Sequence, residues 1–176
     1  MNNHPNQCPA CRLAYAECCQ PLHSGQANAS SPEALMRSRY SAYVLQLYPY
    51  IVETYDATQR AQLTSEQIAQ SALNTHWLGL MVLNSKILPC KQNSEDQFIG
   101  EVEFKVFYSE DKQLYCLHER SDFIQEQGRW VYTTGTFLAD NGAYKVKRND
   151  PCICASGKKY KQCCAMIIAT PTLLRT

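Results

Sequence analysis

Hydrophobic side chains recur at two different spacings along the middle of this chain. From residue 30 to residue 73 the apolar positions follow the helical period. Ser30-Ser31-Pro32-Glu33 is typical of a helix start, because serine caps the first turn, proline fits it and an early carboxylate favours it. Pro49 ends or bends the helix that follows. Its apolar face comprises Leu35, Met36, Tyr40, Tyr43, Val44 and Leu47.

A second helix start stands at Thr64-Ser65-Glu66-Gln67, where a threonine cap and a glutamine three residues later make a capping box. This pattern predicts a short helix over residues 66–73. The side chains of Ile68, Ala72 and Leu73 are expected to point inward.

The spacing then changes to that of strands. Val102, Phe104, Val106 and Tyr108 alternate with charged residues, which indicates a half-buried strand. Turns are expected at Asp111-Lys112 and at Gln127-Gly128. Helices followed by an antiparallel meander predict an α+β domain over residues 30–140, with helices covering one face of a curved sheet. The four expected strands are residues 77–88, 98–108, 114–125 and 129–138.

Eight of the ten cysteines lie in two short clusters near the chain ends. In the C-terminal cluster Cys152-Ile-Cys154 precedes the adjacent pair Cys163-Cys164, and Gly157 can turn the chain back between them. Four thiols on one short loop suit a tetrahedral metal site, for which zinc is the usual ion and iron the alternative. With four protein ligands the site is closed, and therefore structural rather than catalytic. Buried apolar cysteines are the other interpretation, which the lysine-rich surroundings disfavour.

We predict a second metal site in the N-terminal cluster, which like the first ends in Tyr-x-x-Cys-Cys. His4 or His23 is an alternative ligand there. A redox dithiol at Cys8-Pro-Ala-Cys11 is the rival hypothesis, but a thioredoxin-type centre follows a strand in an α/β pattern that this chain lacks. The expected ligands are Cys8, Cys11, Cys18 and Cys19.

The composition is that of a globular protein, with 45% hydrophobic and 19% charged residues. A formal net charge of +1 gives no general attraction for nucleic acid or anionic membranes. The polar start over residues 1–7 lacks a signal-peptide pattern, and no apolar run is long enough for membrane insertion. We therefore expect a cytoplasmic protein, in which reduced thiols favour metal binding over disulfides.

The segment Asp150–Cys164, DPCICASGKKYKQCC, resembles the SEC-C motif, the zinc knuckle at the carboxyl end of the SecA translocation ATPase. Ala155 stands where that motif usually has glycine, whereas Gly157 keeps the later glycine. The N-terminal cluster, the block Pro32–Tyr43, His118-Glu119-x-Ser121-x-Phe123 and Trp130-x-Tyr132 extend the likeness. Together they are similar to the YchJ-like family, small bacterial proteins with a SEC-C knuckle at each end.

This resemblance covers nearly the whole chain. It implies a cystatin/nuclear-transport-factor-2-like cone in the middle, in agreement with the α+β prediction. The N-terminal knuckle departs from the pattern, because Cys-x-Cys has become Cys-x-x-Cys. The SecA likeness implies partners linked to protein export, chaperones or the ribosome. The expected parts are an N-terminal knuckle (1–25), the α+β domain (30–140), a C-terminal knuckle (145–165) and a tail (166–176).

Polar residues of the third expected strand are candidates for a pocket. Neighbours in a strand point to opposite faces, so His118 lies on one face and Glu119 and Ser121 on the other. One of these faces can line the interior of the cone; a solvated outer face or a core histidine with its hydrogen bonds satisfied is the alternative. Arg37 on the first helix is a candidate anion ligand, or else a solvated residue or one that ties the helix to the sheet or a knuckle.

Residues 145–161 carry six cations against Asp150 alone, a net charge of +5. Lys158, Lys159 and Lys161 are candidate contacts for a protein partner or a nucleic-acid backbone, or they merely keep the knuckle soluble. The leading hypothesis is a non-enzymatic, zinc-binding interaction protein. The alternatives are a small-ligand or enzymatic pocket and a nucleic-acid binder.

Overall fold

The computed structural model describes residues 6–89 and 98–170. Its body is an antiparallel sheet in the order β1-β2-β3-β4, as the alternating pattern predicted. Two-residue turns join β2 to β3 and β3 to β4, and both residues of each turn take a positive φ. The strands are β1 (His76–Pro89), β2 (Phe98–Glu110), β3 (Gln113–Glu126) and β4 (Arg129–Phe137), with a short β5 (Gly142–Ala143) paired to β3.

Six helices and two 3-10 turns complete the described part of the chain. Ser31 caps the longest helix, α2, by accepting a hydrogen bond from Ala34 N. The capping box predicted at Thr64 and Gln67 is confirmed at the start of α5. The elements are η1 (Tyr15–Glu17), α1 (Gln20–His23), α2 (Pro32–Val44), α3 (Tyr48–Glu53), α4 (Ala57–Arg60), α5 (Ser65–Ser71), η2 (Tyr160–Gln162) and α6 (Cys164–Ala169).

The prediction that Pro49 ends or bends the first helix was wrong, because that helix ends before Pro49. α2 ends at Val44 because Gln46 takes a φ of 59° and reverses the chain. Pro49 then lies in the first turn of a new helix, α3, where its missing N–H leaves no intrahelical bond unmade. Leu47 is consequently the N-cap of α3 rather than the last turn of α2.

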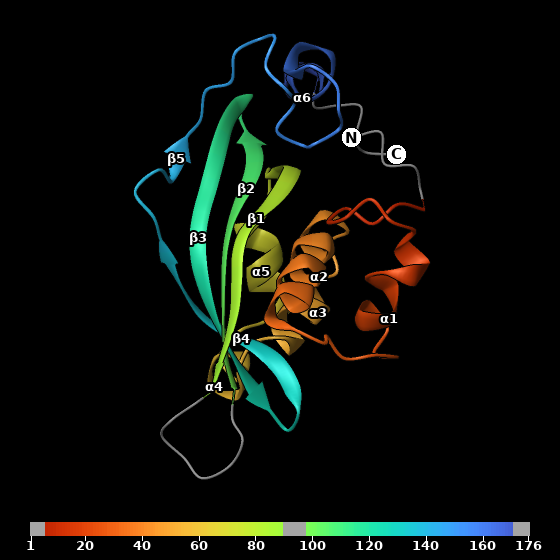
Figure 1. Cartoon of the computed structure of the whole chain (residues 1–176), viewed down its shortest axis with the longest axis vertical. Coiled ribbons are helices and arrows are strands. Elements are labelled where there is room, and N and C mark those ends of the chain that lie inside the picture. Colours follow the sequence, from red (N-terminus) through yellow and green to blue (C-terminus); the bar gives the residue numbers. More distant parts are fainter. Residues whose placement is uncertain (1–5, 90–97, 171–176) are drawn as a thin grey trace.

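The helices α2, α3 and α5 cover one face of the sheet, and α2 packs directly on β1 and β2 (Figure 1). The main core lies between α2 and the sheet and contains Leu35, Val102 and Phe123, which are at most 2% exposed. A second core joins α2 and α3 to α5 through Ala42, Ile51 and Ile68.

Both cysteine clusters pack into this body. Cys8 and Cys19 belong to the main core beside α2. Cys152 and Cys164 belong to a separate core at the other end of the sheet, in which Leu78 is also buried. α6 runs through the expected boundary between residues 165 and 166, so the start of the tail is helical and the rest, from residue 171, lies outside the described residues.

Within residues 6–89 and 98–170, no helix combines the length and apolar character needed to cross a bilayer.

We predict that Gly100→Ala destabilises the body. A Cβ at this position of β2 would lie 2.1 Å from Cγ of Pro32, the buried first residue of α2. The expected loss is about 1–3 kcal/mol in the free energy of unfolding, measured by urea titration. Ile99→Ala is the matched control on the opposite face, because Ile99 is 38% exposed and its truncation is expected to cost less than about 1 kcal/mol. Equal losses in both variants contradict the prediction.

Candidate metal centres

The C-terminal cysteines are carried by a loop that hydrogen-bonds to itself. Pro151 bridges to Lys159, and Cys152 N donates to Lys158 O at 2.9 Å. Ala155 N closes the inner turn by donating to Cys152 O, and Ala155 and Gly157 both take left-handed backbone angles, with φ of 54° and 74°. The 3-10 turn η2 then brings the adjacent pair of cysteines back toward this turn.

The four sulfurs of this loop converge. Every pair of Sγ atoms among Cys152, Cys154, Cys163 and Cys164 is within 4.8 Å, and Cys154 Sγ lies 3.5 Å from the sulfurs of Cys152 and of Cys163. Tetrahedral Zn–S bonds of about 2.3 Å place sulfurs about 3.8 Å apart. The spacing, number and type of the donors therefore fit a four-coordinate metal ion. Cys164 is fully buried, and Ser156 Oγ donates to Cys163 Sγ at 3.3 Å.

The N-terminal cluster repeats this scaffold. Gln7 bridges to Ala14, Cys8 N donates to Leu13 O, and Arg12 N closes the inner turn on Cys8 O. Arg12 takes a φ of 62°, like Ala155 in the other loop. The extra residue of Cys-x-x-Cys is accommodated because this inner turn comprises five residues, 8–12, instead of the four of the other loop, 152–155. The weak sequence repeat is therefore a structural repeat.

The N-terminal sulfurs also gather, though less regularly. The Sγ atoms of Cys8, Cys18 and Cys19 lie within 4.8 Å of one another. Cys11 stands outside that trio, with its Sγ 2.9 Å from Cys18 Sγ. Four thiols are thus available to one ion here too, three of them already converged.

His23 is held away from the ligand role. Its Nε2 donates to Ser38 O at 2.9 Å and its Nδ1 accepts from the Tyr15 hydroxyl at 2.7 Å, so both ring nitrogens are engaged. Burial lowers the pKa of His23, which favours this neutral form. The histidine ties α1 to α2 instead. The other alternative ligand, His4, lies outside the described residues.

Without a bound cation, neither cluster favours ionisation of all four of its thiols. The hydrogen bond from Cys164 lowers the pKa of Cys154 to about 3, and the same contact raises the pKa of Cys164. In the N-terminal cluster the contact with Cys19 lowers the pKa of Cys8 to about 4, whereas burial raises the pKa of Cys18 to about 12. One thiolate per cluster is stabilised by its neighbours, and a cation is needed to bring all four sulfurs into the charged form.

The sequence comparisons agree with this geometry. A family model described as the YchJ middle NTF2-like domain matches residues 31–135, and one for the SEC-C motif matches residues 148–165. The chain belongs to the YchJ-like family. It is 42% identical to a UPF0225 protein of Vibrio parahaemolyticus, with 90% of this chain and 98% of that protein covered. It is 44% identical to one of Shewanella sp. strain MR-4, covering 92% and 97%.

Two solved structures resemble this YchJ-like chain. One is the solution structure of RPA3114, a SEC-C motif containing protein from Rhodopseudomonas palustris, with a TM-score of 0.65 and 34% identity over 75% of this chain and 98% of that one. The other is the crystal structure of a SEC-C motif containing protein from Psychrobacter arcticus, with a TM-score of 0.58 and 32% identity over 91% and 96%. The NTF2-like fold and the terminal cysteine knuckles of this chain are those of the YchJ-like family.

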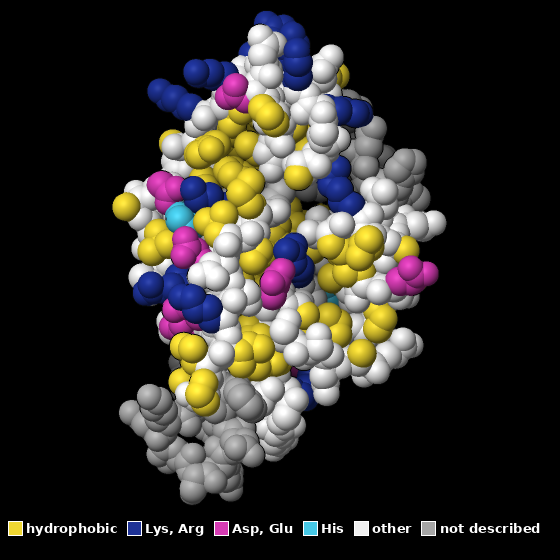
Figure 2. Space-filling view, in the orientation of Figure 1, with side chains coloured by type: hydrophobic (Ala, Val, Ile, Leu, Met, Phe, Trp, Pro, Cys, Tyr) yellow, Lys and Arg dark blue, Asp and Glu magenta, His cyan; other side chains and the backbone are white. Residues whose placement is uncertain are grey.

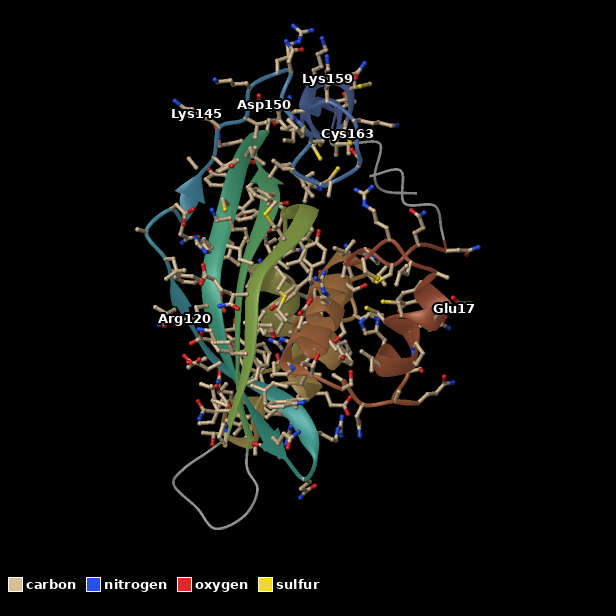
Figure 3. All side chains as sticks on the ribbon, viewed as in Figure 1. Glu17, Arg120, Lys145, Asp150, Lys159 and Cys163 are labelled. Carbon is tan, nitrogen blue, oxygen red and sulfur yellow. The ribbon has the colours of Figure 1, made fainter. Side chains whose placement is uncertain are left out.

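The C-terminal knuckle of this YchJ-like protein lies at one end of the sheet (Figure 3) and contacts both the sheet and the N-terminal knuckle. The Arg12 guanidinium of the N-terminal knuckle donates to Cys154 O of the C-terminal one. Gly79 on β1 lies directly beneath the C-terminal loop, where a Cβ would come within 2.9 Å of Cys154 Cα and Ile153 O. The sequence pattern did not point to either residue, because both contacts join segments far apart in the chain.

The pocket candidates separate in the structure. Glu119 and Ser121 line a cavity between α2 and the sheet. His118 lies on the opposite face, where its Nε2 contacts Glu103 Oε1 at 3.0 Å and its Nδ1 contacts Asp140, so its inclusion among the pocket residues is corrected by the strand alternation. Arg37 is also outside the cavity: it pairs with Glu33 at 2.7 Å and donates to Ala10 O, which ties α2 to the N-terminal knuckle.

A basic surface covers the C-terminal knuckle, at the top of Figure 2. Lys158 and Lys159 are exposed and Lys161 is half-buried. Within the described part of the chain none of the six cations between residues 145 and 161 forms an ion pair with an acidic side chain. Their charge is therefore available to a partner.

We predict that Ala155→Gly stabilises the C-terminal knuckle. Ala155 carries a φ of 54°, where an L side chain costs about 1 kcal/mol and glycine does not. The expected gain is about 0.5–1 kcal/mol in the free energy of unfolding of the metal-loaded protein, measured by thermal or urea denaturation. Ala165→Gly, inside α6, is the control, because glycine in a helix is expected to cost about 0.5–1 kcal/mol. A destabilised Ala155→Gly variant contradicts the prediction.

Proposed function

We propose that this YchJ-like chain is a non-enzymatic zinc protein whose two knuckles are structural metal sites and whose C-terminal knuckle docks a protein partner. The observation that carries the proposal is the convergence of four Sγ atoms within 4.8 Å in a loop that is itself packed into a core of the body. Neither a free surface loop nor a redox pair requires four such sulfurs.

Cys152, Cys154, Cys163 and Cys164 would hold one ion, and Cys8, Cys11, Cys18 and Cys19 the other. When bound, a divalent ion neutralises thiolates that otherwise repel and cross-links each loop. With four thiolates and no place left for water or substrate, such a site supports folding rather than hydrolysis. Zinc is favoured over iron because closed sites with four cysteine ligands and a structural role are typically zinc sites.

A reducing compartment, the cytoplasm, is part of the proposal. All nine cysteines in the described residues have free thiols, including both adjacent pairs. Metal ligation by thiolates needs reduced cysteines, and the cytoplasm keeps them so.

We infer an acidic protein surface as the partner of the C-terminal knuckle. The cations there form no ion pair with an acidic side chain of the described residues, and Met166 in α6, which follows closely in the sequence, is 62% exposed. Exposed charge next to an exposed apolar side chain suits a protein interface with a polar rim. Aromatic side chains for base stacking are limited here to the half-buried Tyr144 and Tyr160, which disfavours single-stranded nucleic acid.

The metal content is the first test. We expect two zinc ions per chain in freshly purified protein by elemental mass spectrometry, and about one in Cys163→Ser/Cys164→Ser and in Cys18→Ser/Cys19→Ser, because each double variant leaves only two ligands in its site. Cys116→Ser is the control: Cys116 is fully buried but belongs to neither cluster, so two ions are expected to remain. Iron in place of zinc, or no metal in the wild type, contradicts the proposal.

The partner is tested by charge. The triple variant Lys158→Gln/Lys159→Gln/Lys161→Gln is expected to capture at least tenfold less protein partner than the wild type in an affinity pull-down. The amount that the wild type captures is expected to fall as the salt concentration rises from 50 to 500 mM. The control variant is Lys86→Gln/Arg120→Gln/Arg129→Gln, which removes the same charge from exposed positions on the sheet. Capture that disappears on nuclease treatment, or that the two triple variants lose equally, argues against this interface.

A further inference from the structure

A cavity of about 230 Å³ lies between α2 and the inner face of the sheet. Its walls are largely aromatic, with Tyr43, Tyr55, Trp77, Phe104 and Tyr132 among them. Its lining includes the exposed Ser71, so a small molecule can reach it from solvent. It is independent of both metal sites, because no cysteine lines it.

Two oppositely charged side chains line the cavity without forming an ion pair with each other. Arg39, which is 7% exposed, is held by the protein itself: its Nη1 donates to Ile51 O and Thr54 Oγ1, and its guanidinium lies 4.4 Å and 4.7 Å from the ring centres of Tyr55 and Tyr132. These contacts explain Arg39 as a structural group that joins α2 to α3.

Glu119 is different, because its partners use only one of its two oxygens. Its Oε1 accepts from Ser121 Oγ at 2.5 Å and from the Tyr132 hydroxyl at 3.2 Å. Burial, followed by the charge of Glu119, raises the pKa of Tyr132, so this phenol remains a donor. Among the described residues no hydrogen bond reaches Oε2, and this oxygen is not sealed from solvent. A carboxylate 8% exposed with one oxygen left over offers an acceptor to a molecule in the cavity.

The neighbouring strand makes room for this carboxylate. A Cβ at Gly135 in β4 would lie 2.0 Å from Glu119 Oε1 and 2.9 Å from the Tyr132 hydroxyl. Glycine weakens a strand interior, and here it allows a charged group to occupy the wall. Tyr40 also lines the cavity, but its hydroxyl is sealed from solvent and its charged neighbours are Cys164, Cys154 and Arg12 of the two knuckles, so it offers nothing to a molecule in the cavity. The polar group that the wall leaves available is therefore the carboxylate of Glu119.

We propose that this cavity binds a small, neutral aromatic molecule with a single N–H or O–H donor that hydrogen-bonds to Glu119 Oε2. The aromatic walls favour an aromatic body. The charges of Arg39 and Glu119 cancel, so a neutral ligand avoids the penalty of adding an unpaired charge. A cavity of about 150 Å³ admits benzene, and by that measure this one admits about nine non-hydrogen atoms. Indole and substituted phenols have this size and chemistry.

The test uses the full-length, zinc-loaded protein and isothermal titration calorimetry with indole. We expect saturable binding with a Kd on the order of 0.1–1 mM, a range that suits a ligand of this size. N-methylindole, which lacks the donor, is expected to bind at least tenfold more weakly. Phenethylamine, a cation of similar size, is expected to bind no better than N-methylindole. Absence of saturable indole binding, equal affinity for the methylated analogue, or tighter binding of the amine overturns the proposal.

Two variants locate the binding. Glu119→Gln is expected to weaken indole binding at least tenfold and to shrink the difference between indole and N-methylindole, and Leu117→Phe, which fills the cavity, is expected to abolish binding of both. Arg120→Gln is the matched control, because Arg120 lies between the two cavity residues Glu119 and Ser121 but points to the other face of β3. Thermal melts confirm folding of each variant. Unchanged indole affinity in folded Leu117→Phe overturns the assignment to this cavity, whatever the zinc content.

Discussion

The architecture depends on sulfur atoms that are candidate metal ligands and core residues at once. Cys19 and Cys164 are at most 2% exposed, and each packs among the apolar side chains of the body. A thiolate in such a place is costly unless an ion compensates it, whereas a protonated thiol is an ordinary small apolar group. Under the proposed metal binding, coordination and core packing are therefore one equilibrium, and the two knuckles are integral to the body rather than appended modules.

The two knuckles also contact each other. Arg12 occupies the left-handed position that Ala155 occupies in the second knuckle, and this backbone angle directs its side chain out of its own loop to Cys154 O. The repeated scaffold thus places a cation at the carbonyl of a candidate ligand residue in the other copy. Under the proposed metal binding, loss of either ion is expected to loosen the surface against which the other knuckle rests, without any shared ligand.

Much of the fold could be predicted from residue spacing. The four strands and both tight turns follow from alternation and from Gln127-Gly128, because one buried face imposes a period of two on each strand. The end of α2 could not be placed, since nothing in Leu45-Gln46-Leu47 announces the positive φ of Gln46. β5 was missed because two residues carry no periodic signal. Gly79 could not be found because its role depends on a loop more than seventy residues away.

The site predictions can likewise be separated into those that depend on local spacing and those that depend on contacts between distant segments. Cysteine spacing identified the ligand clusters because coordination by one short loop is a local property. The alternation of β3 correctly separated His118 from Glu119 and Ser121, but which of the two faces is internal depends on where the helices pack. Once α2 covers the even-numbered positions of β2, the odd-numbered positions of β3 face the same side, because Phe104 and Glu119 are paired across the strands. The place of Glu119 in the cavity wall is therefore decided by register: a shift of one residue would exchange its buried carboxylate for the imidazole of His118 and expose the acid to water.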